Sequence, residues 1–203
     1  MITLLSAAAS PFVRKVRVLL LETQQDDVAL QDVTTTPVAT APEVASANPV
    51  GKIPALIRDD GPALYDSRVI CRFLDDRAKA GLYPDHQLWD TLTLEATADG
   101  ILDAALLITY EARMRPEDKQ WMDWADAQWS KIENACAALT ARWMSHLNGP
   151  LDMGQIAVAC SLAYVDFRHD ARGWRKNNDA LAQWYQTFSE RPSMKVTQPP
   201  EGA

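Results

Sequence analysis

Residues 48–56 (NPVGKIPAL) form the stretch whose residue types point most directly to ligand binding. An Asn-Pro pair opens it, as is typical of a turn, and Gly51 permits a backbone torsion that is closed to other residues. Pro54 cannot donate to a strand ladder, and it pushes Ile53 into an extended conformation. We therefore expect the amide and carbonyl of Ile53 to face a cleft, where they could pair with an extended peptide ligand by strand addition.

A second such stretch is Asp66-Ser67, about ten residues after the strand expected at 53–57. Its carboxylate and hydroxyl stand immediately before apolar residues at helical spacing, namely Val69, Ile70, Phe73 and Leu74. The free N–H groups of a helix N-terminus so placed can bind an anion. Without a ligand, the two stretches would be no more than a turn, a strand and a helix cap.

Ser10 and Pro11 predict the start of the first helix, because a serine hydroxyl caps the helix and the proline ring already has the torsion of the first turn. Apolar residues recur at helical spacing from Phe12 to Thr23. The charged residues are expected on the other face of this helix: Arg14, Lys15, Arg17 and Glu22.

These segments together resemble the glutathione-binding half of the glutathione S-transferase family, with its pattern N-P-x-G-K-[VI]-P-x-L and then an acidic residue plus Ser at the start of a helix. The resemblance implies that Ile53 pairs through its backbone with the cysteinyl part of glutathione and that Pro54 is cis. Asp66 and Ser67 would hold the γ-glutamyl group. Lys52 would reach the glycyl carboxylate, although a solvated loop lysine is the alternative.

The resemblance also assigns a catalytic role to Ser10, which matches the first residue of the family's C-P-F-C or serine-type segment. A free thiol has a pKa of about 8.5, and a hydroxyl hydrogen bond and the positive end of a helix both lower it. Ser10 offers both devices, with Ser6 as a nearby competitor and simple helix capping as the alternative. Because cysteine is missing at this place, disulfide reduction is disfavoured. The first strand contains no tyrosine, which excludes the tyrosine-type subgroups.

Composition restricts the class of protein. The 203 residues, 47% of them hydrophobic, suffice for one large or two small domains. With a net charge of −7 and dispersed Lys and Arg, no basic stripe is available for a nucleic acid. The N-terminus lacks a charged n-region, and charged residues interrupt the next apolar run. We therefore expect neither a signal peptide nor a membrane span, and we expect a cytoplasmic protein.

The cysteines and histidines suggest no metal site. Cys71, Cys136 and Cys160 are odd in number, widely spaced and embedded in helical patterns, which is typical of buried small hydrophobes in a reducing compartment. The three histidines lie far apart and show no ligand spacing.

The expected first domain spans residues 1–79, and its fold class is α/β. Strands are expected at 1–5, 28–33, 53–57 and 63–64, and helices at 10–23, 42–46 and 66–78. This β-α-β-α-β-β-α order, with a proline opening the third strand, is the thioredoxin-like arrangement that the family resemblance implies. Glycine and proline in residues 80–86 predict a linker.

Residues 87–203 are expected to form an all-α domain, a helical bundle. Helical patterns cover 88–113, 116–147 and 178–189, and another begins after Asp152. Asp152 and Gln155 predict a capping box, in which Asp152 accepts from the Gln155 amide and Gln155 reaches back.

The resemblance assigns the second substrate to a pocket between Phe12 and the long helix, with Tyr110 and Arg113 as candidates. Trp174 is another, for which buried packing is the alternative. Such walls imply a small, largely apolar electrophile. An acidic residue near Asp99 can cross a dimer interface toward the glutathione amine in this family; a solvated or capping carboxylate is the alternative.

The activity implied by the resemblance is that of a transferase that conjugates glutathione, as co-substrate, to an electrophile and acts as a homodimer, without a metal, nucleic-acid or membrane partner. The segment SPFVRK and residues 98–104 (ADGILDA) look like a bacterial subgroup. Glutathione-dependent isomerisation or dehalogenation would use the same thiolate. The rival interpretation is a non-catalytic glutathione-binding or protein-interaction module, because folds outlive their chemistry.

Overall fold

Two units make up the chain in the computed structural model, which describes residues 1–200. One unit contains Met1–His86 and residues 192–200, and the other contains Gln87–Arg191. The C-terminal segment from residue 192 therefore belongs with the N-terminal residues, although its position in the sequence placed it with the helical domain.

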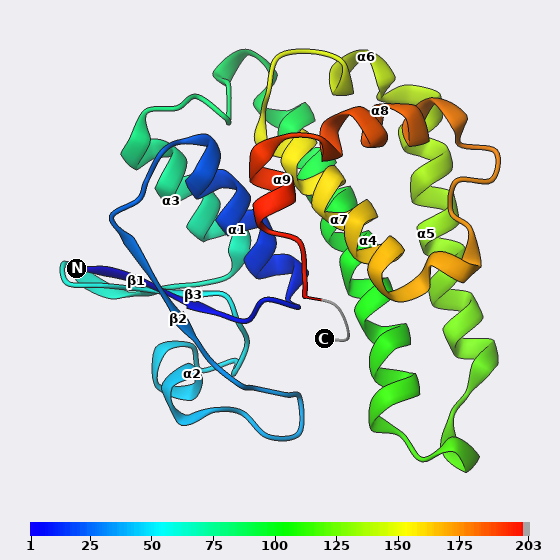
Figure 1. Ribbon diagram of the computed structural model, residues 1–203, viewed down its shortest axis with the longest axis horizontal. Coiled ribbons are helices and arrows are strands. Elements are labelled where there is room, and N and C mark those ends of the chain that lie inside the picture. The colour runs from blue at the N-terminus through cyan, green and yellow to red at the C-terminus, as the bar shows by residue number, and fades with distance from the viewer. Residues whose placement is uncertain (201–203) are drawn as a thin grey trace. The chain divides into compact units, whose positions relative to one another are not determined.

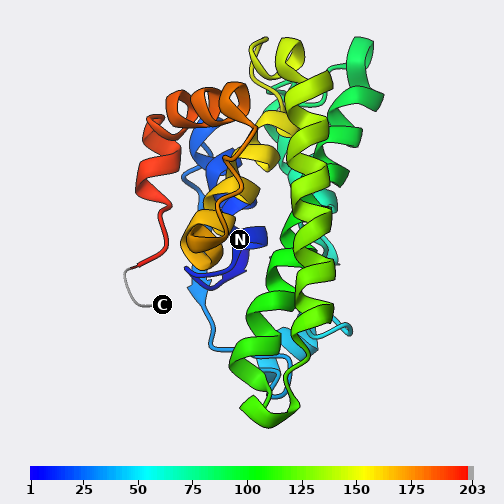
Figure 2. The same cartoon turned by 90° about the vertical axis from the view of Figure 1, so that its right-hand side faces the viewer.

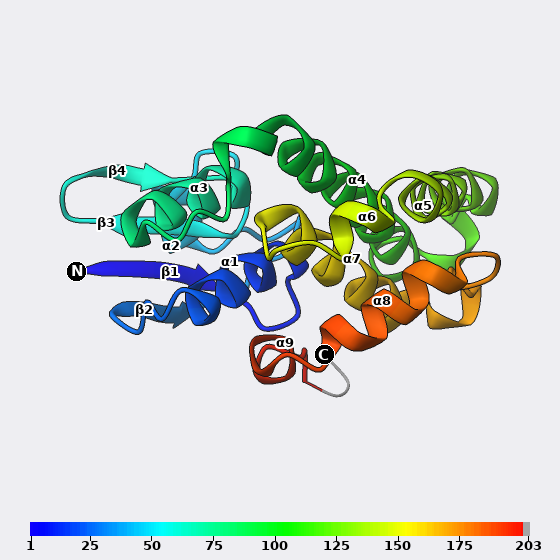
Figure 3. The same cartoon turned by 90° about the horizontal axis from the view of Figure 1, so that it is seen from above.

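A mixed four-stranded sheet organises the first unit. Its strands are β1 (Ile2–Ser6), β2 (Val28–Asp32), β3 (Ala55–Arg58) and β4 (Gly61–Leu64), in the order β2-β1-β3-β4 (Figures 1 and 3). Strand β1 is parallel to β2 and antiparallel to β3, which is antiparallel to β4. The apolar run that predicted a central strand is confirmed, since Leu4 and Leu5 on β1 are fully buried.

Helices cover the sheet on both sides. Helices α1 (Pro11–Glu22) and α3 (Ser67–Ala78) pack against each other on one side, and the short α2 (Pro42–Ala47) lies on the other (Figure 1). Val44 of α2 joins Leu5, Val33 and Ala55 in a hydrophobic cluster. The thioredoxin-like fold class predicted for this part of the chain is confirmed. Strand β3 begins at Ala55, however, so Ile53 and Pro54 precede the strand.

Two of the charged residues expected on the face of the first helix opposite its apolar residues are buried. Lys15 is fully buried and Arg14 is 7% exposed. Helix α9 (Pro192–Val196) packs on α1, and the Arg14 guanidinium donates to the carbonyl of Met194 at 2.9 Å and to Thr197 Oγ1 at 3.3 Å. A buried arginine is tolerated where its donors find such acceptors.

The second unit is entirely helical within the residues described. Its helices are α4 (Leu88–Met114), α5 (Met122–Arg142), α6 (Met144–Leu147), α7 (Met153–His169) and α8 (Asp179–Ser189), with short 3-10 turns η2 (Glu117–Lys119) and η3 (Asp170–Arg172). A further 3-10 turn, η1 (Asp85–Gln87), spans the boundary between the two units. Figure 2 shows α4 and α5 side by side. None of the helices within residues 1–200 is both long and apolar enough to cross a lipid bilayer.

Helix α7 forms the core of this unit, because every residue from Met153 to Val165 is buried. It packs against α4 at close range: a Cβ added at Gly154 would lie 2.8 Å from Cβ of Leu94. The three cysteines are buried as predicted, and burial raises the pKa of Cys136 to about 12.

Candidate functional site

The loop before β3 is held in shape by Asn48, which is 3% exposed. Its Nδ2 donates to the carbonyl of Lys52 at 2.8 Å, and its Oδ1 accepts from the amide of Val50 at 3.0 Å. Gly51 has a φ of +70°, which is the left-handed conformation anticipated from the sequence. The turn therefore delivers the chain to Ile53 in a fixed path.

The Ile53-Pro54 peptide bond is cis, as the resemblance implied. Ile53 is half-buried, and within residues 1–200 its amide and carbonyl make no hydrogen bond. A backbone donor and acceptor left open beside the start of a strand can receive an extended peptide. Lys52 next to it is exposed.

The strand register brings this loop close to the start of the first helix. Leu5 on β1 is paired with Ala55 on β3, and the two strands are antiparallel. The chain that leaves β1 toward Ser10 and the chain that enters β3 through Ile53 therefore lie at the same edge of the sheet.

The same edge receives the start of α3. Leu64, the last residue of β4, is paired with Leu56 near the start of antiparallel β3. Asp66 follows at once, after a cis Tyr65-Asp66 peptide bond. The three stretches that the sequence singled out are thus neighbours at one edge of the sheet.

Asp66 is the N-cap of α3, where its Oδ1 accepts from the amide of Arg68 at 3.1 Å. Its other carboxylate oxygen lies 2.8 Å from the Arg68 guanidinium. Partial burial works to raise the pKa of Asp66, but the hydrogen bonds from Arg68 and the charges of Arg68 and buried Lys15 outweigh it, so the pKa lies below its usual value. The carboxylate is 53% exposed and ionised at neutral pH, as a cation-binding group must be.

Ser67, the first residue of α3, is only 2% exposed. Its burial beside Asp66 places a hydroxyl and a helix N-terminus together, which is the arrangement predicted from the sequence. The charge of Lys15 on Asp66 was not foreseen, because the helical pattern put that lysine only on the face opposite the apolar residues.

Ser10 is the N-cap of α1, and its Oγ accepts from the amide of Val13 at 3.4 Å. A hydroxyl that accepts in this way still has its own proton to donate. Ser10 is partly exposed, whereas the competitor Ser6 is 1% exposed at the end of β1. Of the two hydroxyls, that of Ser10 is the more accessible to a ligand.

The remaining candidates belong to different elements of the chain. Phe12 is half-buried on α1 of the first unit. Asp99 is 8% exposed in the middle of α4, in the second unit, and Tyr110 and Arg113 lie near the C-terminal end of that helix. Trp174 is 2% exposed, and its Nε1 donates to Asp166 at 2.7 Å, so this side chain is a packing residue.

Two residues near Tyr110 and Arg113 were missed by sequence reasoning: Tyr164 and Arg168 on α7. Burial and the charge of Tyr164 raise the pKa of Tyr110, and the charge of Arg168 only partly opposes them. The charge of Arg113 lowers the pKa of Arg168. The signal was available in the spacing, because Tyr164 and Arg168 are four apart on one helical face.

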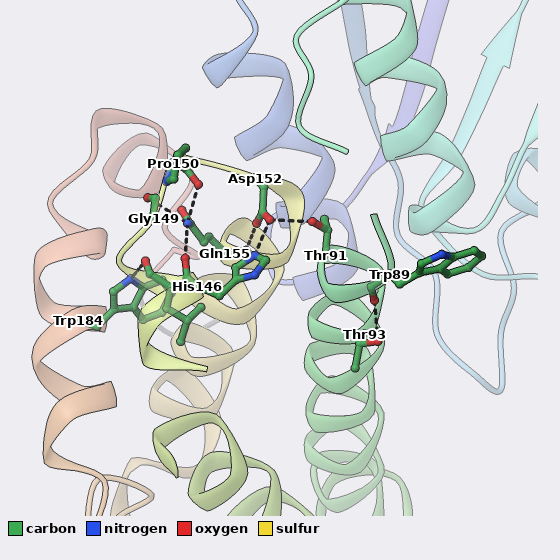
Figure 4. A network of polar contacts seen from close by, with 10 residues as sticks. Trp89, Thr91, Thr93, His146, Gly149, Pro150, Asp152, Gln155 and Trp184 are labelled. Atoms are coloured by element: carbon green, nitrogen blue, oxygen red, sulfur yellow. Dashed lines mark hydrogen bonds and ion pairs between the residues drawn. The ribbon is translucent and has the colours of Figure 1, made fainter. Parts of the chain in front are cut away.

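Asp152 caps α7 as predicted, with Oδ1 accepting from the Gln155 amide at 3.0 Å (Figure 4). The expected return contact of Gln155 is different. Its Nε2 donates to the carbonyls of His146 on α6 and of Gly149 and Pro150 in the loop after it, at 3.1, 3.3 and 2.7 Å. The Gln155 side chain thus fixes the loop before the helix.

Two further partners of Asp152 were not predicted. Its Oδ2 accepts from Thr91 Oγ1 at 2.8 Å and lies 2.6 Å from His146 Nε2, and Asp152 itself is fully buried (Figure 4). This network joins α4, α6 and α7 and has a structural role. In the residues described, no group of three or more His, Cys, Asp or Glu is placed to hold a metal ion.

Known proteins resemble the chain along nearly all its length. Residues 4–81 match the glutathione S-transferase N-terminal domain, and residues 122–187 match the C-terminal domain of that family. The uncharacterized GST-like protein YibF of Escherichia coli K12 is 30% identical over 203 residues, which is 98% of each chain.

A glutathione transferase family member from Pseudomonas fluorescens Pf-5 is 46% identical, over 98% of this chain and 100% of that chain. It was solved with bound glutathione (TM-score 0.95) and with bound S-(propanoic acid)-glutathione (TM-score 0.91). With the matched fold and both matched domains, the chain belongs to the glutathione S-transferase family.

Proposed function

We propose that this protein conjugates glutathione to a small electrophile, with the glutathione thiolate stabilised by Ser10. The observation that carries the proposal is the strand register, in which Leu5 faces Ala55 and Leu56 faces Leu64. It gathers a hydroxyl, an open backbone and an ionised carboxylate at one edge of the sheet. The glutathione-bound relative at 46% identity supports the same ligand.

Each part of glutathione has a proposed partner in the first unit. The amide and carbonyl of Ile53 pair with the cysteinyl backbone, as in strand addition. The ionised Asp66 and the N-terminus of α3 at Ser67 hold the ammonium and carboxylate of the γ-glutamyl group. Exposed Lys52 reaches the glycyl carboxylate.

Ser10 supplies the chemistry in this proposal. Its hydroxyl donates to the sulfur, and the positive end of α1 favours the anion, so the thiol loses its proton to solvent more easily. The thiolate then forms a carbon–sulfur bond with the electrophile, and the bonding electrons of the leaving group depart with it. The thiolate, and not the neutral thiol, is the nucleophilic form of a cysteine side chain.

The electrophile contacts in this proposal are Phe12, Tyr110 and Arg113, and the protein acts as a homodimer to which Asp99 contributes toward the glutathione amine. The relative that holds S-(propanoic acid)-glutathione supports an S-substituted glutathione as the product class. A non-catalytic glutathione-binding module is the second candidate, because the contacts proposed for Ile53 and Asp66 require no turnover.

Calorimetric titration with glutathione and with S-methylglutathione tests the binding part of the proposal. Saturable binding of both is expected, because the proposed contacts are to the γ-glutamyl, cysteinyl and glycyl parts, not to the thiol proton. Absence of binding at millimolar glutathione would contradict the enzyme and the binding-module interpretations together. Ile53→Pro removes the Ile53 amide donor and should weaken the binding of both ligands. Ile57→Ala, at an exposed position on β3, is the control and should bind them as the wild type does.

A further inference from the structure

We propose that Arg14 is a positioning residue, which ties the first turn of α1 to the C-terminal segment 192–197 and thereby holds the Ser10 hydroxyl in place. Because the role of Ser10 belongs to the proposed function, this device rests on that function and deepens it. We call the set of contacts the C-terminal clasp. Its members are Arg14 and Glu22 on α1, and Ser193, Met194 and Thr197 in the segment.

The Arg14 side chain is anchored in a buried place. Its Nη2 donates to the carbonyl of Met194 at 2.9 Å, and its Nε donates to Thr197 Oγ1 at 3.3 Å. The Thr197 hydroxyl donates in turn to the carbonyl of Ser193 at 2.8 Å, and both Met194 and Thr197 are 1% exposed. A buried guanidinium that loses its acceptors is costly, so these contacts fix Arg14 against the segment.

The Arg14 backbone is bonded directly to Ser10. Its amide donates to the Ser10 carbonyl at 3.0 Å, and the Ser10 amide donates to the carbonyl of Ala7 at 2.9 Å. The Ser10 hydroxyl, by contrast, accepts from the Val13 amide at 3.4 Å, which is long for a hydrogen bond. The place of the hydroxyl therefore depends on the backbone of the first turn, which Arg14 anchors.

The clasp also holds the other end of α1. Ser193 Oγ donates to Oε1 of Glu22, the last residue of the helix, and α9 packs on α1 (Figure 1). Arg14 and Glu22 are separated by about two helical turns. Attachment at two such points resists both sliding and rotation of the helix, and so fixes the direction of Ser10 at its start.

Position matters for the chemistry proposed for Ser10, because a hydroxyl stabilises a thiolate only while it lies within hydrogen-bond distance of the sulfur. The charge of Arg14 is a second explanation, since a cation near a helix N-terminus favours an anion by itself. The two explanations make different predictions. Positioning requires the Ser10 hydroxyl, whereas a direct effect of the charge persists without it.

The test is the pH titration of the glutathione thiolate by its ultraviolet absorbance, in full-length protein saturated with glutathione. Arg14→Gln should raise the thiol pKa by about 0.5–1 unit, and it should add nothing in the Ser10→Ala protein, where the hydroxyl is already missing. Thr197→Val removes one acceptor and leaves every charge in place. It should raise the thiol pKa in the same direction by a smaller amount.

Arg17→Gln is the matched control, because it removes the same charge from the same helix, and its thiol pKa should equal that of the wild type. An unchanged thiol pKa in folded Arg14→Gln, even with lower stability toward denaturant, overturns the inference. Equal rises with and without the Ser10 hydroxyl overturn it too, in favour of the charge. Should Arg14→Gln fail to fold, Thr197→Val in the two backgrounds decides in the same way.

Failure of the proposed function gives a different result. If Ser10→Ala itself leaves the thiol pKa unchanged, the role proposed for the Ser10 hydroxyl is contradicted, and the positioning role of Arg14 is contradicted with it. A raised thiol pKa in Ser10→Ala with no change in Arg14→Gln and Thr197→Val contradicts the clasp alone.

Discussion

Leu5 on β1 pairs with Ala55 on β3, and this register brings together two of the stretches that we propose to bind glutathione. It sets the end of the first strand against the start of the third, so that Ser10 and Ile53 share one edge of the sheet. Along the chain these two residues are separated by α1, β2 and α2. The proposed chemistry depends on that edge, and the predictions below test its parts and its supports.

Asp66→Asn is expected to weaken glutathione binding roughly 10- to 100-fold, because an amide replaces an ionised acceptor for the γ-glutamyl ammonium. Calorimetry measures the loss. Asp76→Asn, which removes an exposed carboxylate from the same helix, is the control and should bind as the wild type does. Equal losses in both variants would show a general charge effect.

The pH dependence of binding follows from the direction of the Asp66 shift. Since the folded-state pKa of Asp66 is lowered, its carboxylate contribution is present above the ordinary aspartate pKa of about 3.9 and is lost only as the pH falls through the lowered value. Protonation of Asp66 should therefore not lower the affinity for glutathione between pH 7 and pH 5. Arg68→Gln should move the loss to higher pH, and an unchanged profile in that variant would contradict this assignment.

Asp152→Ala is expected to lower the free energy of unfolding by roughly 2–4 kcal/mol. About 1 kcal/mol comes from the lost helix cap, and the rest comes from the hydroxyl of Thr91 and the imidazole of His146, which lose a buried acceptor. Denaturant unfolding measures the change. Asp118→Ala in the exposed η2 turn should change stability by less than about 0.5 kcal/mol.

Gly154→Ala is expected to destabilise the protein by about 1–3 kcal/mol, because the new Cβ would lie 2.8 Å from Cβ of Leu94. Gly100→Ala is the matched control, since nothing lies within 4 Å of its added Cβ and α4 is helical there. That control should gain roughly 0.5–1 kcal/mol. Thermal unfolding compares the two, and a Gly154→Ala protein as stable as the wild type would show that α4 and α7 can move apart.

Local signals predicted much of the fold and part of the site. Ser10, Asp66 and Asp152 were identified as helix caps because a cap depends on residues within three positions along the chain. The left-handed turn at Gly51 and the path into Ile53 were likewise local.

Contacts between distant segments could not be read in the same way. The burial of Arg14 depends on acceptors at residues 194 and 197, and Asp152 meets a threonine on another helix. The effect of the Arg113 charge on the pKa of Arg168 depends on how α4 and α7 pack together. Periodicity assigns a residue to a face of its helix, but it does not say what covers that face.

The central claim is that Ser10 stabilises the thiolate of bound glutathione. Its most direct test is the pH titration of that thiolate by its ultraviolet absorbance, in the wild type, Ser10→Ala and Ser6→Ala. We expect a thiol pKa well below about 8.5 in the wild type and in Ser6→Ala, and a rise of about 1–2 units in Ser10→Ala with glutathione still bound. The same thiol pKa in Ser10→Ala as in the wild type would remove Ser10 from the chemistry.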